Sequence, residues 1–142
     1  GDSSRILPSL TSVERYDPTT NAWEVVAPMV TPRENHALAV LDGKLYAVGG
    51  KHYDVDDGLL LLSSVERYDP TENAWEAVAP TAEERDELAV AVLDGKLYAV
   101  GGYNNDDGWF NSVERYDLAT NAWEAIAPPM PTERAFFGLV SL

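Results

Sequence analysis

Two kinds of side chain in this sequence could bind another molecule, namely aromatic rings and arginines in its variable segments. Large aromatic residues and arginine are the usual anchors of protein interfaces, and arginine also pairs with acidic groups. The predicted partner-binding residues are Tyr53, Tyr103, Trp109, Phe110, Arg33, Arg85 and Arg134. Trp109 is the predicted main anchor, but the alternative that Trp109 and Phe110 only cover a blade edge or the dimer seam is slightly favoured. The arginines recur at regular intervals, so a structural role is also open for them and is slightly favoured.

Catalytic and metal chemistry find little support in the sequence. There is no Cys, and the two imidazoles, His36 and His52, lie in different segments. The acidic run at 54–58 is similar to a calcium loop, but its twelfth position is Val65, where a bidentate Glu is required. We therefore predict no enzyme, no cofactor and no metal site. Acid–base chemistry by clustered carboxylates, as in a hydrolase or isomerase, remains a remote alternative.

Composition limits the possible partners. The 10 Lys and Arg residues against 24 Asp and Glu give a net charge of −14, which opposes binding to nucleic acid and to anionic lipid. The acidity is best explained as a surface that keeps the protein in solution, and a basic peptide partner is the alternative. The sequence has neither a signal peptide nor an apolar run long enough to cross a membrane, so we expect a cytoplasmic protein if it is natural and assign no location if it is engineered.

Internal repeats dominate the chain. SVERYDPTTNAWE at 12–24 returns with one change at 64–76 and with two changes at 112–124, while LDGKLYAVGG occupies both 41–50 and 93–102. A period of about fifty residues is typical of arrays in which each unit buries its apolar face against its neighbours. Repetition therefore indicates scaffold, and function is expected where the copies differ.

Each period contains signals for four antiparallel strands. Asp42-Gly43 and Asp94-Gly95 predict tight hairpins. We label the strands A, after the recurring arginine; B, carrying LYAVGG; C, carrying SVERYD; and D, carrying NAWE. The variable segments are then the B–C loops and the D–A connectors. The Glu-Arg dipeptide of each strand C is interpreted as a repeated ion pair.

A Gly-Gly doublet followed at fixed offsets by Tyr and Trp resembles the kelch motif, and the block order resembles the kelch-like family in particular. The predicted structural residues are Gly49, Gly50, Gly101, Gly102, Tyr16, Tyr68, Tyr116, Trp23, Trp75 and Trp123. The resemblance implies an all-β fold of four-stranded blades in a β-propeller, usually six-bladed, which binds partner peptides through B–C and D–A loops. Family members include substrate adaptors of cullin ubiquitin ligases. We also expect each Gly-Gly to lie beneath a Trp or Tyr ring.

The strand count predicts a half-propeller occupying residues 1–142 as a single domain. The repeats span approximately 1–32, 33–84 and 85–133, and 134–142 is a closing strand A. Three blades are too few to close a ring, so we predict a homodimer in which the C-terminal strand of each chain completes the first blade of the other. The alternative is a fragment of a longer propeller.

The leading functional prediction is a non-catalytic protein-interaction module or scaffold. Near-identity of the copies indicates either a recent duplication or, as the favoured origin, a consensus-like engineered sequence. A designed, self-assembling structural protein without a ligand is therefore the alternative function.

Overall fold

The structure is a computed structural model that describes residues 11–126. Every element of regular structure in this range is a β-strand, as predicted. The strands are β1 (Val13–Asp17), β2 (Ala22–Val26), β3 (Ala37–Leu41), β4 (Lys44–Val48), β5 (Lys51–Asp54), β6 (Gly58–Leu61), β7 (Val65–Asp69), β8 (Ala74–Val78), β9 (Ala89–Leu93), β10 (Lys96–Asn104), β11 (Gly108–Asp117) and β12 (Ala122–Ile126).

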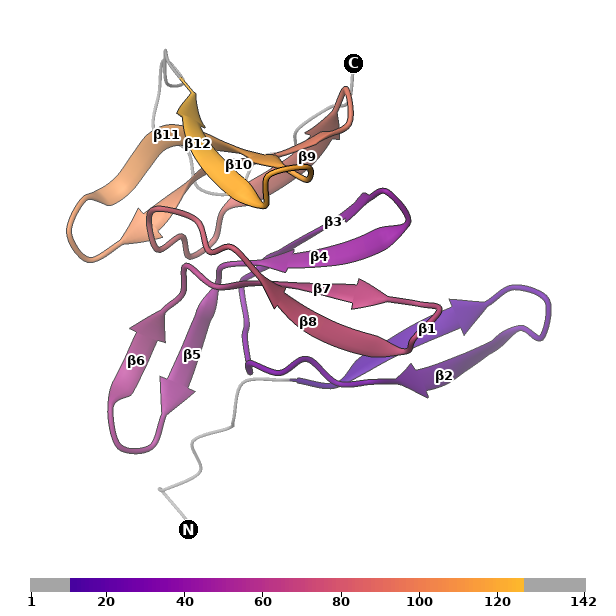
Figure 1. Ribbon diagram of the computed structural model, residues 1–142. Coiled ribbons are helices and arrows are strands. Elements are labelled where there is room, and N and C mark those ends of the chain that lie inside the picture. The colour runs from indigo at the N-terminus through magenta and orange to yellow at the C-terminus, as the bar shows by residue number, and fades with distance from the viewer. Residues whose placement is uncertain (1–10, 127–142) are drawn as a thin grey trace, which may run out of the picture.

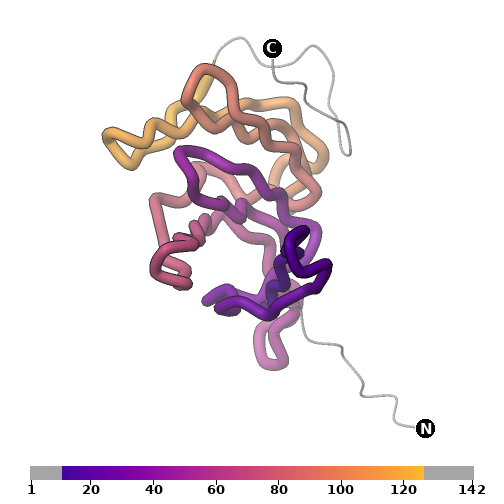
Figure 2. The backbone as a smooth tube through the Cα atoms, turned by 90° about the vertical axis from the view of Figure 1, so that its right-hand side faces the viewer, coloured from indigo at the N-terminus to yellow at the C-terminus, as the bar shows by residue number. Residues whose placement is uncertain are grey.

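The strands form three successive units, which we call blades I, II and III. Blade II is the four-stranded antiparallel sheet β3-β4-β7-β8, and blade III is the sheet β9-β10-β11-β12. Blade I consists of the pair β1-β2, which are strands C and D by sequence. Blade II lies between the other two, and the blades follow one another in chain order (Figures 1 and 2). The four-stranded blades confirm the predicted unit.

The hairpin between strands A and B forms where the sequence predicts it. Leu41 pairs with Lys44 across Asp42-Gly43, and these two turn residues have φ angles of 51° and 75°. Two positive φ values define the type I′ turn, whose twist matches that of the flanking strands. The copy at Asp94-Gly95 has φ angles of 52° and 73°. The turn chemistry therefore fixes the register of both blades.

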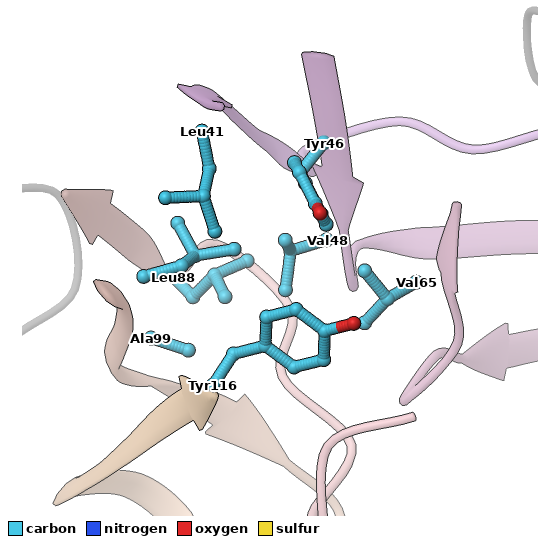
Figure 3. Packing of buried hydrophobic residues seen from close by; sticks show 8 residues of the cluster. Leu41, Tyr46, Val48, Val65, Leu88, Ala99 and Tyr116 are labelled. Carbon is cyan, nitrogen blue, oxygen red and sulfur yellow. The ribbon is translucent and has the colours of Figure 1, made fainter. Parts of the chain in front are cut away.

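Blades II and III pack face to face through a shared apolar core. Its fully or nearly fully buried members are Leu41, Tyr46, Val48, Val65, Leu88, Leu97, Ala99 and Tyr116. The rings of Tyr46 and Tyr116, one from each blade, lie 5.8 Å apart between centroids. Figure 3 shows the side chains of Leu88, Ala99 and Tyr116 facing those of Leu41, Val48 and Val65. Since a buried large apolar side chain stabilises by about 1.5–3 kcal/mol, this core joins the two blades firmly.

The Gly-Gly doublets do not lie beneath aromatic rings, and that prediction is wrong. A Cβ added at Gly50 would lie 2.5 Å from the carbonyl oxygen of Glu34, and one at Gly102 would lie 2.9 Å from that of Asp86. The glycines therefore allow the backbone of the D–A connector to cross strand B closely. One consequence is a hydrogen bond from the Gly50 N–H to the Arg85 carbonyl oxygen, 2.8 Å, which links blade II to the next connector.

Blade I leaves the flank of blade II partly uncovered. Leu38 and Val40 of β3 are 52% and 62% exposed, whereas their equivalents in β9, Val90 and Val92, pack against the core of blades II and III. A cavity of about 440 Å³ lies at this boundary, lined by Val13 and Glu14 of blade I and by residues of blade II that include Leu38 and Leu45. At the equivalent boundary between blades II and III, β9 packs against β3.

Candidate functional site

Two B–C hairpins project from the same side of the molecule (Figure 1). The first is β5-β6, and the second is formed by the ends of β10 and β11. Each tip is an Asx-turn: Asp54 Oδ1 accepts hydrogen bonds from the backbone N–H groups of Asp56 and Asp57, and Asn104 Oδ1 does the same for Asp106 and Asp107. These acidic tips therefore have a structural explanation that needs no calcium ion.

The D–A connectors lie beside the bases of the B–C hairpins. Glu34 forms an isolated β-bridge with Lys51, and Asp86 forms one with Tyr103. The hydrogen bonds of the second bridge are 3.0 Å and 2.9 Å long. Both predicted loop sets are thus brought together, in blade II and in blade III, at one end of the strands.

Three of the predicted anchors are available at this end. Trp109 is 43% exposed and Tyr53 is 40% exposed. Tyr103 is half-buried and faces Trp109 across the hairpin, with ring centroids 5.1 Å apart in a T-shaped arrangement. Such a pair holds both rings in place, so Trp109 is presented in a fixed orientation rather than on a free loop.

Phe110, Arg33 and Arg85 are buried, so the prediction that they bind a partner is wrong. Phe110 is buried beneath the guanidinium of Arg85, whose Cζ lies 4.9 Å from the ring centroid. The side chains of Arg33 and Arg85 have no exposed surface. All three residues are therefore structural. Arg134 lies outside the described residues.

The buried arginines are held by residues from strands B and C of their own blade and from the start of the B–C segment. Arg33 donates to the carbonyl oxygens of Gly49 and Ser64, at 3.0 Å and 2.9 Å, and forms an ion pair with Glu66 at 2.8 Å. Arg85 makes the corresponding contacts with Gly101, Ser112 and Glu114, the last at 2.9 Å. A buried charge is tolerated when it is paired and its donors are used. Arg85 also donates from Nε to Glu114 at 3.0 Å, whereas the buried Nε of Arg33 has no partner among the described residues.

The glutamate of each pair also holds the connector. Glu66 accepts hydrogen bonds from the backbone N–H groups of Val30 and Thr31, and Glu114 accepts one from Ala82. The adjacent arginine of the Glu-Arg dipeptide points elsewhere: Arg67 pairs with Glu76 of strand D on the exposed side. The interpretation of this dipeptide as one ion pair is therefore wrong, because neighbouring residues of a strand face opposite sides.

Burial shifts two pKa values near the connectors. Burial, helped by the charge of Arg33, lowers the pKa of His36, so this imidazole is neutral at pH 7. Burial raises the pKa of Asp86 above its usual range. Neither residue is part of a group of metal-ligating side chains, since residues 11–126 contain no cluster of three or more His, Cys, Asp or Glu able to hold a metal ion.

A second repeated arrangement holds the end of each strand D. Asn73 Oδ1 accepts hydrogen bonds from the Tyr68 hydroxyl, 2.7 Å, and from the Ala27 N–H, 3.0 Å, while the Trp75 indole donates to the Ala27 carbonyl oxygen, 2.8 Å. Both backbone groups of an alanine in the preceding connector are thus satisfied by one blade. Asn121, Tyr116 and Trp123 hold Ala79 in the same way.

Sequence comparison assigns this arrangement of blades. A family model described as the KLHDC2/KLHL20/DRC7 Kelch-repeats domain matches residues 4–142. The chain belongs to the kelch-repeat family. The solved structure titled "Structure of YjhT" superposes on 92% of this chain and 54% of that chain with a TM-score of 0.75 at 17% identity, which supports the β-propeller fold.

Curated relatives carry kelch-like names. The chain is 40% identical over 107 residues to human Kelch-like protein 28, an alignment that covers 73% of this chain and 19% of that protein. It is 46% identical over 86 residues to mouse Kelch-like protein 35, with 61% and 14% covered, and 37% identical over 94 residues to zebrafish Kelch-like ECH-associated protein 1B, with 66% and 16% covered. The chain spans less than a fifth of each relative. The part of the chain that the structure describes has no helix able to span a bilayer.

Sequence reasoning missed the buried partners of the arginines. Glu66 and Glu114 recur with the same period as Arg33 and Arg85, and this joint recurrence was the available signal. It also missed the double role of Asn73 and Asn121 in holding the preceding connector, although the Asn recurs in every NAWE block.

Proposed function

We propose that this chain is a non-catalytic protein-interaction module that binds a protein ligand across its B–C hairpins and D–A connectors. The observation that carries the proposal is the fixed Tyr103–Trp109 pair, which presents a large, partly exposed indole on the hairpin whose Tyr103 bridges to Asp86 of the connector. A rigid aromatic side chain loses little conformational entropy on binding and is a common interface hot spot.

The surroundings of this indole favour a ligand with basic and apolar groups. Tyr53 and Leu59, which pair across the first hairpin, are both partly exposed, and the two hairpin tips carry Asp56, Asp57, Asp106 and Asp107. Acidic groups around an aromatic anchor attract cations and speed association. The net charge of −14 acts in the same direction.

A peptide library displayed on phage and selected on the purified chain at about 0.15 M salt tests the proposal. Replacing Trp109 with Ala should weaken the selected peptides by roughly thirtyfold, the effect of losing an interface hot spot of about 2 kcal/mol. Val25→Ala is the control, because Val25 is exposed on β2, away from the hairpins. Titration calorimetry provides the affinities.

Two results would contradict this proposal. Peptides that bind the Trp109→Ala variant as tightly as the original chain would show that the hairpin face is not the binding surface. Failure to select any binder would favour the alternative, a self-assembling structural protein without a ligand.

We also propose that two copies associate to form a six-bladed ring by strand exchange. The exposed Leu38 and Val40, and the cavity between blades I and II, support this proposal, because both mark a position that further strands would cover. Light scattering should give twice the 15.6 kDa mass of one chain. A well-folded sample with the mass of a single chain would contradict it.

A further inference from the structure

Blade I carries the same side chains with which blades II and III hold the D–A connector of the blade before them. We call this set the connector receptor. In blade II it consists of Ser64, Glu66, Tyr68, Asn73 and Trp75. In blade III it consists of Ser112, Glu114, Tyr116, Asn121 and Trp123. The equivalent residues of blade I are Ser12, Glu14, Tyr16, Asn21 and Trp23.

An occupied receptor contacts its connector at two points. In blade II, Asn73 and Trp75 hold both backbone groups of Ala27, at 3.0 Å and 2.8 Å. Further along the same connector, Arg33 is held by Glu66 at 2.8 Å and by Ser64. In blade III the two points are Ala79 and Arg85. The ligand of a receptor is therefore an alanine at the end of a strand D, followed by an arginine.

The receptor of blade I has neither contact within the described residues. Trp23 is 67% exposed, and the indole has no hydrogen-bond partner in residues 11–126, although the Tyr16 hydroxyl already bonds to Asn21 Oδ1 at 2.6 Å. Tyr16 is 45% exposed, against 6% for Tyr68. Glu14 is exposed at the mouth of the cavity that Ser12 also lines. The side chains are set in place, and no connector between residues 11 and 126 contacts them.

The sequence contains a third connector of the required kind. Ala127-Pro128 follows strand D of blade III, as Ala27-Pro28 and Ala79-Pro80 follow strands D of blades I and II, and Arg134 then precedes a strand-like apolar segment. This segment lies outside the described residues. Two of the three Ala-Pro connectors thus have a known receptor, and one receptor has no known connector.

The same copy of the chain cannot bring Ala127 to its own blade I. Ala127 directly follows Ile126 of β12, and consecutive residues are only about 3.8 Å apart. Blade III and blade I lie on opposite sides of blade II (Figures 1 and 2). An Ala127 docked on blade I would therefore belong to a different copy.

We propose that the connector receptor of blade I is the docking site for the connector at 127–134 of a second copy of this chain. Ala127 of that copy bonds to Asn21 and Trp23, and its Arg134 pairs with Glu14 and Ser12. This proposal rests on the proposed association of two copies and gives that association its specific contacts. Reciprocal docking provides two identical junctions per dimer.

Sedimentation velocity over a range of concentrations tests the docking site. Glu14→Gln and Trp23→Ala should each raise the dimer dissociation constant by at least about a hundredfold, since loss of one partner of a buried interface pair has an effect of this size. Matched controls come from the same blade: Glu24→Gln removes the same charge from an exposed pair, and Val25→Ala truncates an exposed side chain. The controls should change the constant by less than about threefold.

Hydrogen exchange of the Trp23 indole N–H, followed by NMR, gives a second measurement. The indole N–H resonance, assigned with a Trp23→Phe variant, should exchange with solvent freely in dilute, dissociated protein and become protected as copies associate, as it becomes hydrogen-bonded. Circular dichroism of the dilute variants checks that they remain folded. Each variant changes a residue that is exposed in the separate chain, so folding should be preserved.

The possible outcomes separate the two proposals. A chain that stays single at every concentration overturns both. A stable dimer in which Glu14→Gln and Trp23→Ala behave like their controls, or in which the Trp23 indole stays exchangeable, retains the proposed association and overturns the docking site.

Discussion

Blades I and II contain nearly the same thirteen residues in two different environments. SVERYDPTTNAWE and SVERYDPTENAWE differ only in that blade I has Thr20 where blade II has Glu72. Both fold into a C–D hairpin with the same pairing, for example Tyr16 with Trp23 and Tyr68 with Trp75. In blade II the hairpin holds a connector and is partly buried. In blade I it is exposed. Local sequence therefore determines the hairpin, whereas the neighbouring connector determines how much each side chain contributes to stability.

Replacing the first glutamate of strand C should give the largest difference in unfolding free energy between these two hairpins. Glu66→Gln leaves Arg33 buried without its carboxylate, and breaking a buried ion pair in this way costs about 3–5 kcal/mol of unfolding free energy. Glu14→Gln should cost less than about 0.5 kcal/mol in dilute protein, because Glu14 is exposed. Urea denaturation measures both values. Equal losses would contradict the comparison.

The tryptophans should give the next largest difference. Trp75→Ala removes a ring that packs at the junction of blades I and II and an indole that donates to Ala27, so we expect a loss of about 3 kcal/mol. Trp23→Ala should lose less than about 1 kcal/mol in dilute protein, since Trp23 mainly contacts Tyr16. Thermal unfolding followed by circular dichroism would rank the two variants. A larger loss for Trp23→Ala would show that blade I is already packed against another segment.

Replacing the asparagine of each hairpin measures the contribution of a single hydrogen bond, the one from the Ala27 N–H to Asn73. Asn21 and Asn73 both have positive φ, 51° and 49°, so replacement by Gly preserves the backbone conformation in each hairpin. Both variants lose the bond to the tyrosine hydroxyl, but only Asn73→Gly also loses the bond from the Ala27 N–H. We expect Asn73→Gly to be about 1 kcal/mol more destabilising. No difference in urea midpoint would mean that water replaces this contact without loss.

The exposed ion pairs should give the smallest difference. Arg15–Glu24 and Arg67–Glu76 join strands C and D on the surface of the two blades. Glu24→Gln and Glu76→Gln should each cost less than about 1 kcal/mol, and added salt should reduce both effects. Denaturation in low and high salt provides the measurement. If Glu76→Gln lowered the unfolding free energy as much as Glu66→Gln, the exposed and buried sides of strand C would contribute equally to stability, contrary to this comparison.

The repeats and the Asp-Gly turns were sufficient to predict the four-stranded blades, because hairpin chemistry is local, whereas the propeller followed from the resemblance to the kelch motif. The binding surface was predicted only in part. Trp109 and Phe110 are adjacent on β11, and since successive strand residues face opposite sides, one of them had to point inward. Arg33 and Arg85 could not be placed from local sequence, because their glutamates lie 33 and 29 residues away.

The contacts between a blade and the connector before it make the two sides of a repeat different. Blades II and III each hold the connector that precedes them, through Ala27 and Ala79, and the proposed docking on blade I would extend this pattern to every blade. Such blades can be reordered along the chain without changing any junction, as long as the side that holds a connector always meets the side that supplies one. A tandem fusion of two copies, or a circular permutation that cuts the chain between blades I and II, should thus retain the same set of contacts and change only where the covalent link falls.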